Sequence, residues 1–460
     1  SLVGSEMCIR DRYMKDKFLK SIQRKSWLLL ALFFISSCSN EDIVKHPVIT
    51  NKYDPSKPQV LTGFIPEKGG IGDKIIVQGN FGTDLSKMKV IFADTKEANI
   101  ISSDGTSIYC TVPKQPGGNN SVKVVVDDKE LTIDKTFAYT QVQKVSTVCG
   151  TYNKRGDTDG NIYDALFNNV FAVGIVAGDN IVAVESDKQR VRLISESENL
   201  VTTLISGFKA GKPAINKTRD KMYFIDVKSA KVYILRRENS WQPELLREGI
   251  TELSANNGET WSCIIDDEEK YLYTRNHLGI FVRINLTEKD DSGQYKVEKL
   301  LEHRWDFEAW VSDHCSYLAY SRVEDCFYFA EDRTHAVYRI KQNADGTWSD
   351  ERYAGNGWPN QTNTEGYRED IQFAWPNGVT VDNEGNIYVV NAGGQSIRKI
   401  SYPDGYVTIA AGGTMSGETE TDGLPLECTF LYPKDIAMDS EENFYIAGGA
   451  GLNVRKLAIE

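Results

Sequence analysis

The sequence has few histidines, no closely paired cysteines and none of the common catalytic motifs. Five histidines occur in 460 residues, and the eight cysteines include no CxxC pair. This spacing does not indicate a zinc site or a thiol–disulfide redox pair. A GxSxG elbow, an HExxH zinc motif and a phosphate-binding loop are also missing from the sequence. The usual signatures of hydrolases, metalloproteases and nucleotide-binding proteins are therefore not found.

The chain also lacks an excess of positive charge. Its formal net charge is −12, and residues 1–37 hold seven Lys and Arg against three Asp and Glu, so the remainder carries 46 basic and 62 acidic residues. A surface with this balance repels nucleic acid phosphates and anionic lipid headgroups. We therefore expect no nucleic acid partner. An acidic polymer is a poor ligand unless a local basic patch binds it.

Long apolar runs are missing, apart from one short run near the start. Residues 27–35 are apolar and follow a basic segment, but they are too few to span a bilayer. The tetrapeptide ending at Cys38 resembles a bacterial lipobox, which implies a lipoprotein signal peptide over residues 14–37 and a diacylglycerol on the Cys38 thiol. An ordinary secretory signal with a chance cysteine is the alternative. Residues 1–13 precede Met14 and are interpreted as a non-native leader.

The residues after Cys38 indicate where in the cell the protein is expected. Residues 39–42 read Ser-Asn-Glu-Asp. This resembles surface lipoproteins of the Bacteroidota, in which acidic residues directly after the lipidated cysteine accompany display on the outer leaflet. The resemblance implies a protein anchored in the outer membrane and exposed at the cell surface, with residues 38–56 as a polar tether.

Residues 57–140 have the pattern of a small β domain. Short β-rich runs alternate with Gly, Pro and Asp turns, which is typical of an immunoglobulin-like sandwich. The opening, with Pro66, Gly69 and the Gly79-Asn80-Phe81 segment, resembles the IPT/TIG domain. We interpret the domain as a spacer without chemistry of its own.

The rest of the chain is repetitive. Residues 375–400 contain three β-rich runs separated by turns, residues 433–457 repeat this pattern, and four weaker copies precede them. The six units recur roughly every 40 to 60 residues, the period of propeller blades. Three units share a second signature, in which Thr-Asp-Gly or Thr-Glu-Gly stands seven residues before a phenylalanine. These phenylalanines, expected to pack between blades, are Phe167, Phe373 and Phe430.

These residues resemble the NHL repeat. The resemblance implies that the all-β chain consists of an IPT/TIG sandwich followed by a six-bladed NHL-type β-propeller over residues 141–460. Residues 145–149 look like the outer strand of a blade, but they precede the first complete unit. We therefore expect them to pair with the last blade and close the ring, which removes an exposed sheet edge.

Function is expected on the face built by the loops that lead into each first strand and by those that join the second and third strands. Aligning the repeats places Phe171, Trp261, Tyr317 and Asn377 where first strands begin. Long loops of the fourth and fifth units add Trp305, Asp306, Trp310, Trp358 and Asn360. Aromatic faces beside carboxylates and amides suit a neutral sugar, although large aromatics are also common core residues.

A catalytic centre is not indicated. His303, His314 and His335 fall in one region of the fourth unit and His277 in the third, whereas a metal on a propeller axis needs ligands from several blades. We assign no catalytic residue, no metal and no cofactor. The acidic residues that end several second strands, such as Glu185 and Asp226, are interpreted as stabilising turns.

The sequence therefore predicts a lipid-anchored, non-catalytic surface protein that captures a glycan. Similar lipoproteins of gut Bacteroidota accompany starch-utilisation-type outer-membrane transporters, and that resemblance implies a polysaccharide-uptake partner. Two alternatives stay open. One is a scaffold for protein–protein interaction or adhesion, and the other is a metal-dependent propeller lyase or hydrolase.

Overall fold

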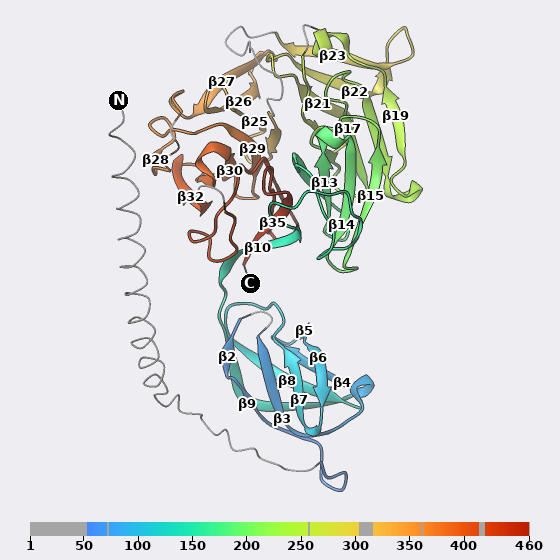
Figure 1. Ribbon diagram of the computed structural model, residues 1–460, viewed down its shortest axis with the longest axis vertical. Coiled ribbons are helices and arrows are strands. Elements are labelled where there is room, and N and C mark those ends of the chain that lie inside the picture. The colour runs from blue at the N-terminus through green and yellow to red at the C-terminus, as the bar shows by residue number, and fades with distance from the viewer. Residues whose placement is uncertain are drawn as a thin grey trace, which may run out of the picture. The chain divides into compact units, whose positions relative to one another are not determined.

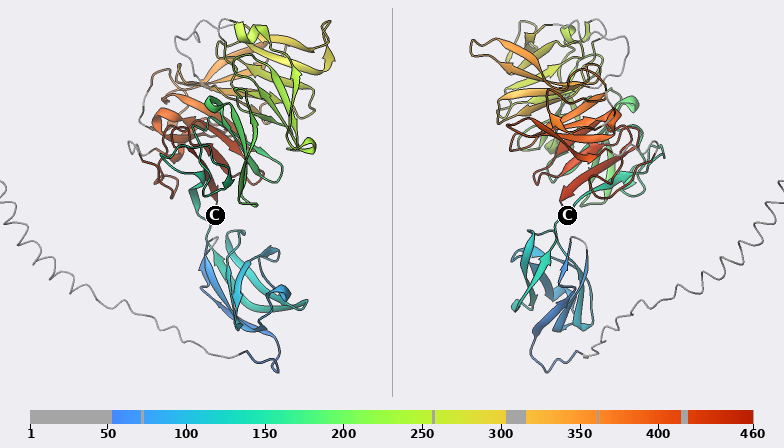
Figure 2. Two further views of the ribbon diagram at one scale, coloured as in Figure 1. Left: turned by 45° about the vertical axis from the view of Figure 1, so that its right-hand side comes forward. Right: turned by 90° about the vertical axis from the view of Figure 1, so that its left-hand side faces the viewer.

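The computed structural model describes residues 53–70, 73–255, 258–302, 316–359, 361, 363–413 and 419–459. In this part of the chain strands predominate, and the helical segments are short, as Figure 1 and Figure 2 show. These segments are α2 (Thr251–Ser254) and the 3-10 turns η1 (Leu85–Lys87), η2 (Ser186–Lys188), η3 (Arg237–Asn239) and η6 (Ala392–Gly394). No helix of the described residues is long and apolar enough to cross a membrane.

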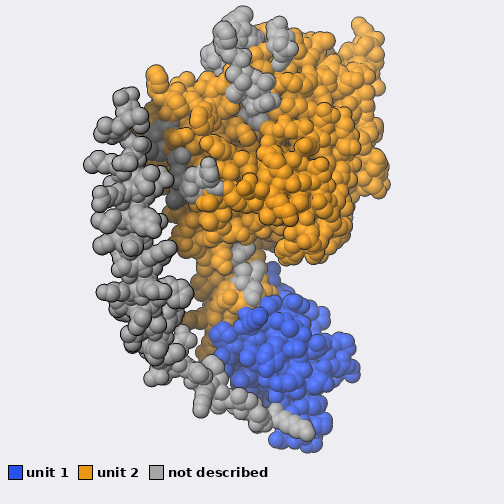
Figure 3. Space-filling view, in the orientation of Figure 1, with its two compact units in different colours: residues 1–66, 74–111, 122–135 blue, residues 67–73, 112–121, 136–460 orange. Residues whose placement is uncertain are grey.

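The chain divides into two compact units (Figure 3). Unit 1 comprises residues up to Pro66, Lys74–Thr111 and Val122–Lys135, and unit 2 comprises Glu67–Asp73, Val112–Ser121 and Thr136–Glu460.

The first nine strands form a two-sheet sandwich. One sheet has the order β1-β3-β7-β6 and the other β2-β9-β8-β4-β5. Inward residues alternate with outward ones, as in β4, where Met88, Val90 and Phe92 are buried. The predicted immunoglobulin-like sandwich is confirmed. Its strands are β1 (Val60–Ile65), β2 (Lys68–Gly69), β3 (Lys74–Gly82), β4 (Met88–Phe92), β5 (Lys96–Glu97), β6 (Asn99–Ser103), β7 (Gly105–Thr111), β8 (Gly118–Val126) and β9 (Lys129–Tyr139).

The remaining strands form six antiparallel sheets, the blades of a propeller. Blade 1 contains β11 (Gly160–Asn161), β12 (Ala172–Val176), β13 (Asn180–Glu185), β14 (Arg190–Ser195) and β15 (Leu200–Ser206). Blade 2 contains β16 (Ala214–Ile215), β17 (Lys221–Ile225), β18 (Val232–Arg236) and β19 (Pro243–Arg247). Blade 3 contains β20 (Cys263–Ile265), β21 (Tyr271–Arg275), β22 (Phe281–Lys289) and β23 (Tyr295–Leu301).

The other three blades follow the same order. Blade 4 contains β24 (Leu318–Ser321), β25 (Cys326–Glu331), β26 (Ala336–Gln342) and β27 (Trp348–Ala354). Blade 5 contains β28 (Gly366–Tyr367), β29 (Pro376–Val381), β30 (Ile387–Asn391), β31 (Ser396–Ile400) and β32 (Tyr406–Gly412). Blade 6 contains β33 (Asp435–Met438), β34 (Phe444–Ala447), β35 (Asn453–Ile459) and β10 (Gln143–Gly150). All six predicted units are found.

Blade 6 takes its outer strand from the segment that precedes blade 1. β10 pairs antiparallel with β35, from Gln143 opposite Ile459 to Gly150 opposite Asn453. The predicted ring closure by residues 145–149 is therefore confirmed. Without this segment, blade 6 would have only three strands, and β35 would be an unpaired edge.

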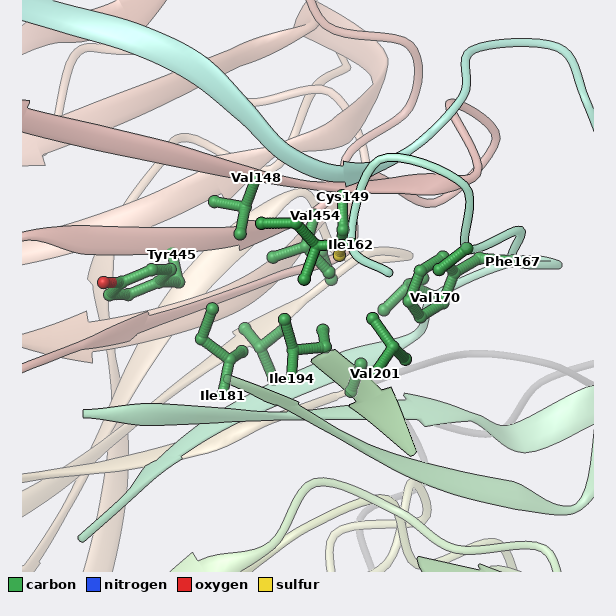
Figure 4. Close-up of a cluster of buried hydrophobic side chains, with 14 of the residues drawn as sticks. Val148, Cys149, Ile162, Phe167, Val170, Ile181, Ile194, Val201, Tyr445 and Val454 are labelled. Carbon is green, nitrogen blue, oxygen red and sulfur yellow. The ribbon is translucent and has the colours of Figure 1, made fainter. Parts of the chain in front are cut away.

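The seam between blades 6 and 1 is a hydrophobic core (Figure 4). Cys149 of β10 and Val454 of β35 pack in one cluster with Ile194 and Val201 of blade 1, together with Phe167. Phe167, like Phe373 and Phe430, is completely buried. The expectation that these phenylalanines pack between blades is confirmed.

The Thr-acid-Gly signature is a structural clamp. In blade 1, Thr203 of the outer strand donates its backbone N–H to Asp159 (2.8 Å), and the buried Arg192 donates to Asp159 (2.9 Å) and to the carbonyl of Thr158 (2.5 Å). The guanidinium of Arg192 also lies over the Phe167 ring, 4.1 Å from its centroid. The clamp thus ties the loop, the third strand and the fourth strand together. Arg398 in blade 5 and Arg455 in blade 6 bind the carbonyls of Thr364 and Thr421 in the same way.

All cysteines of the described residues are buried and unpaired: Cys110, Cys149, Cys263, Cys326 and Cys428. Burial raises the pKa of the Cys110 and Cys263 thiols to about 12 and that of Cys326 to about 11. A thiol with a raised pKa and no access to solvent is a poor nucleophile. Cys315 lies outside the described residues.

These thiols should be unreactive in the native protein. In protein lacking residues 1–38, six cysteines remain, and we expect DTNB to titrate at most one of them, Cys315, until denaturant exposes the other five. Cys315→Ser is the control and should leave no fast-reacting thiol. Two or more fast thiols would contradict the buried positions.

Candidate functional site

The end of the ring where the first strands begin is closed by a polar plug on the axis. Lys212, in the loop before β16, donates from Nζ to Asp435 Oδ1 (2.7 Å) and to the carbonyl of Ile436 (3.0 Å), both in blade 6. It also reaches the carbonyl of Val379 in blade 5 (3.4 Å). Since blades 2 and 5 are not neighbours, these groups can meet only near the axis.

Blades 1, 3 and 4 join the same plug. Asp435 Oδ2 accepts the backbone N–H of Val173 in blade 1 (3.0 Å), and Tyr317, before β24, donates its hydroxyl to the carbonyl of Phe171 (2.7 Å). The N–H of Lys212 donates to the carbonyl of Trp261 (2.7 Å), before β20. Burial raises the pKa of Asp435, and the nearby Lys212 ammonium partly opposes this rise. The hydrogen bonds of the plug thus involve residues of all six blades.

The four residues that the sequence placed where first strands begin are all buried. Tyr317 is fully buried, Trp261 is 1% exposed, Asn377 2% and Phe171 6%. Phe171 stacks on Trp261 with ring centroids 5.9 Å apart, and the Trp261 indole N–H donates to Glu259 (3.1 Å). A buried ring has no face to offer a sugar. Phe171, Trp261 and Tyr317 lie together in one buried cluster, and Asn377 is buried as well, so none of the four offers an exposed surface.

Of the site residues predicted on long loops, the structure describes one, and it is exposed. Trp358 is 72% exposed, and its backbone N–H donates to Asn356 Oδ1 (3.2 Å), which holds the loop around it. The other loop candidates, Trp305, Asp306, Trp310 and Asn360, lie outside the described residues. His303 and His314 do as well.

Two exposed aromatics were not among the predicted site residues. Trp375 and Tyr432 stand at equivalent positions before the first strands of blades 5 and 6, each followed by proline, and each is 43% exposed. Both have left-handed backbone, with φ of 48° and 46°. The sequence feature that could have identified both residues is the repeated aromatic–Pro dipeptide, Trp375-Pro376 and Tyr432-Pro433.

The neighbourhood of Trp375 is built to accept its ring. Its N–H donates to His335 Nδ1 (3.3 Å), from the loop joining β25 and β26. The indole lies against Gly393, where an added Cβ would come within 2.3 Å of a ring carbon. Any larger residue at position 393 would push the indole away. The backbone of Trp375 is therefore bonded to His335, and its indole packs against Gly393.

The histidines of the described residues act as hydrogen-bond acceptors. His277 Nδ1 accepts the N–H of Glu259 (2.9 Å), and His335 Nδ1 accepts that of Trp375. Burial lowers the pKa of both imidazoles, which favours the neutral form that can accept. Across the described part of the chain, no group of three or more His, Cys, Asp or Glu could hold a metal ion.

The acids at the ends of second strands stabilise the loops that lead into the blades. Glu185 accepts the N–H of Asn168 (2.6 Å), and Asp226 accepts that of Lys209 (3.2 Å). In blade 6 the corresponding residue is Gly448, and Glu420 takes over by accepting the N–H of Leu431 (2.8 Å). The interpretation of Glu185 and Asp226 as structural residues is confirmed.

One solved structure is similar to this chain over most of its length. The crystal structure of a structural genomics protein of unknown function from Bacteroides thetaiotaomicron is similar over 89% of this chain and 100% of its own, with 36% sequence identity and a TM-score of 0.62. The chain belongs to the same protein family as that Bacteroides protein. Residues 60–140 of this family member match the IPT/TIG domain model. None of the curated proteins matches the chain.

Two more distant structures share the fold of this family. They are auxiliary nutrient binding proteins from Bacteroides ovatus and Bacteroides thetaiotaomicron, each 21% identical over 89% of this chain and 99% of their own, with TM-scores of 0.63 and 0.56. At this level of identity the likeness establishes the architecture, an all-β chain with a propeller.

Proposed function

We propose that this protein is a lipid-anchored, non-catalytic surface protein that captures a glycan for a polysaccharide-uptake system. The observation that carries the proposal is the set of exposed aromatic side chains on loops of one propeller face, namely Trp358, Trp375 and Tyr432. The shared fold with two auxiliary nutrient binding proteins supports a role in nutrient binding.

The chemistry of this face favours a neutral sugar. An exposed indole or phenol ring offers a flat apolar surface on which the CH face of a pyranose can stack. Single exposed aromatics are common on protein surfaces, but Trp375 is fixed by His335 and Gly393 in a backbone conformation that non-glycine residues seldom adopt. The net charge of −12 favours an uncharged glycan over an acidic one.

The location follows from the amino-terminal segment. A lipid on Cys38 and the acidic residues after it would hold the protein in the outer membrane with its propeller at the cell surface. The proposed partner is a starch-utilisation-type transporter in the same membrane, to which the bound glycan would pass. The IPT/TIG sandwich would serve as the spacer between anchor and propeller.

The test is a glycan array probed with protein lacking residues 1–38. We expect binding to at least one neutral glycan. Trp358→Ala, Trp375→Ala and Tyr432→Ala, with Trp305→Ala and Trp310→Ala alongside, are each compared with the parent. Loss of a central stacking ring should weaken binding by about 5- to 30-fold, equivalent to about 1–2 kcal/mol. Tyr402→Ala is the matched control, because Tyr402 is a 39% exposed aromatic in the turn between β31 and β32, at the opposite end of the strands.

Other results would contradict the proposed site or favour one of the two alternative functions. Unchanged binding in all five variants would show that the loop face is not the site. An array without any bound glycan, together with specific capture of a surface protein, would favour the scaffold. Product release from a polysaccharide that stops on addition of EDTA would favour a metal-dependent lyase or hydrolase.

A further inference from the structure

A second set of aromatic side chains surrounds a pocket between blades 3 and 4. The pocket has a volume of about 210 Å³, and its walls include Tyr273, Tyr320, Phe327 and Trp348. Asp266 and Asp325, which also line it, lie in the turns that join the first and second strands of the two blades. These turns are at the opposite end of the strands from Trp358 and Trp375. The pocket is therefore separate from the loop face.

The aromatic rings form a floor and walls. Phe327 is 4% exposed, and its centroid lies 4.8 Å from that of Tyr273, 5.1 Å from Tyr320 and 6.2 Å from Trp348. The three surrounding rings are only partly buried and are tilted by 42° to 48° to Phe327. Phe327 therefore supports the three outer rings from below, and a ring-shaped ligand in the pocket would meet the partly exposed faces of Tyr273, Tyr320 and Trp348.

The two carboxylates are held in place, with one oxygen each to spare. Asp325 Oδ1 accepts the Tyr320 hydroxyl (2.5 Å), and Asp266 Oδ1 accepts the backbone N–H groups of Lys270 (2.7 Å) and Tyr271 (3.0 Å). Within the described residues neither carboxylate forms an ion pair, and neither Oδ2 has a hydrogen-bond partner. The pocket thus offers fixed acceptors beside apolar ring faces.

The pocket also offers donors. The Trp348 indole N–H has no hydrogen-bond partner among the described residues, and the Gln342 amide, which donates one bond to the carbonyl of Gly346 (3.1 Å), has a second N–H. A cationic ammonium ligand could use the carboxylates and rings but would leave these donors without an acceptor. An anion would be repelled by Asp266 and Asp325. A neutral polyol ring satisfies both donors and acceptors.

We propose that this pocket is a second sugar site that takes one neutral pyranose ring. The ring would stack on the aromatic walls, and its hydroxyls would donate to Asp266 and Asp325 while accepting from Trp348 and Gln342. The volume is below the roughly 300 Å³ at which pockets for drug-sized ligands begin, so one residue or chain end of a glycan fits rather than a longer stretch. The ligand class rests on the proposed function, whereas the position does not.

The experiment measures methyl glycosides of glucose, galactose, mannose and xylose by saturation-transfer NMR on protein lacking residues 1–38. We expect at least one to bind, and binding to fall by about tenfold or more in Trp348→Ala and in Asp325→Ala. Asp325 is exposed, so its replacement should leave the fold intact even if Trp348→Ala disturbs packing. Asp291→Ala, an exposed carboxylate of blade 3 outside the pocket, is the matched control and should bind normally.

The results separate this proposal from the function of the loop face. Array glycans whose binding depends on Trp358 or Trp375, with no glycoside binding that depends on Trp348 and Asp325, would overturn the pocket and leave the proposed function standing. No sugar bound in either experiment would overturn both. Choline bound instead of glycosides, and lost in Asp325→Ala, would overturn the sugar assignment in favour of a cation site.

Discussion

Asp435→Asn is expected to lower the free energy of unfolding by about 3–5 kcal/mol, the usual consequence of removing one partner of a buried ion pair. Asp435 is fully buried, and it accepts from Lys212 Nζ and from the Val173 N–H. Without the carboxylate charge, the buried Lys212 ammonium keeps only neutral partners, such as the carbonyls of Ile436 and Val379. Urea denaturation followed by tryptophan fluorescence measures the change. In protein lacking residues 1–38 every tryptophan lies at or beyond position 241, so the signal reports on the propeller alone.

Two control variants show how much the Lys212–Asp435 ion pair contributes to the free energy of unfolding. Glu288→Gln breaks an exposed ion pair with Lys296, whose atoms are 3.8 Å apart, and should change stability by less than about 1 kcal/mol. The double variant Lys212→Met with Asp435→Leu replaces both charges by apolar groups and should be more stable than Asp435→Asn. A change below about 1 kcal/mol in Asp435→Asn itself would mean that the plug does not hold the blades together.

Removal of β10 is the second large perturbation. Protein that begins at residue 142 keeps the strand, and protein that begins at residue 151 lacks it. The longer protein should unfold cooperatively. The shorter one should lose this transition and aggregate, because β35 becomes an open edge and the side chains of Val145, Val148 and Cys149 leave the cores around the seam. Size-exclusion chromatography and denaturation curves compare the two.

A peptide of residues 142–151 provides a further control for this truncation. Added during refolding of the shorter protein, it should restore soluble monomer by occupying the vacant edge of β35. A shorter protein that is monomeric by itself, with an unchanged denaturation midpoint, would show that ring closure by β10 is dispensable.

The architecture was predictable because it rests on local periodicity. Short β-rich runs, turn residues and the Thr-acid-Gly spacing each act within one blade, so the strands of all six units and the burial of Phe167, Phe373 and Phe430 followed from them. The closing strand was predictable for a related reason. Residues 145–149 have the pattern of an outer strand but no blade of their own, and blade 6 lacks one.

Which aromatics reach the surface was not predictable. Alignment of repeats identifies where a first strand begins, but it does not give the distance of a side chain from the axis. Trp261 and Tyr317 are buried, whereas Trp375, which directly precedes β29 and has a left-handed backbone, is exposed. The plug itself joins Lys212 and Asp435 over 223 residues. No sequence pattern marks such a pair.

The pocket between blades 3 and 4 was missed for a similar reason. Its lining comes from separate segments of two blades, between Ile264 and Trp348. A repeat pattern describes one blade at a time and does not show which side chains of two blades meet.

The Arg clamps are unevenly distributed around the ring, and this has a consequence for how the protein can vary. Arg192, Arg398 and Arg455 bind their Thr-acid-Gly loops in blades 1, 5 and 6, which are consecutive because blade 6 adjoins blade 1. Peptide links every pair of successive blades, because β10 of blade 6 continues along the chain into blade 1, and the ring is held shut by the β10–β35 pairing within blade 6. The clamps lie in this blade and in its two neighbours. In blades 2 to 4 all strands follow one another along the chain, so their sequences can depart from the repeat without opening the ring. We therefore expect sequence change to be least costly on the side of the propeller opposite the β10–β35 pairing, where the pocket between blades 3 and 4 lies.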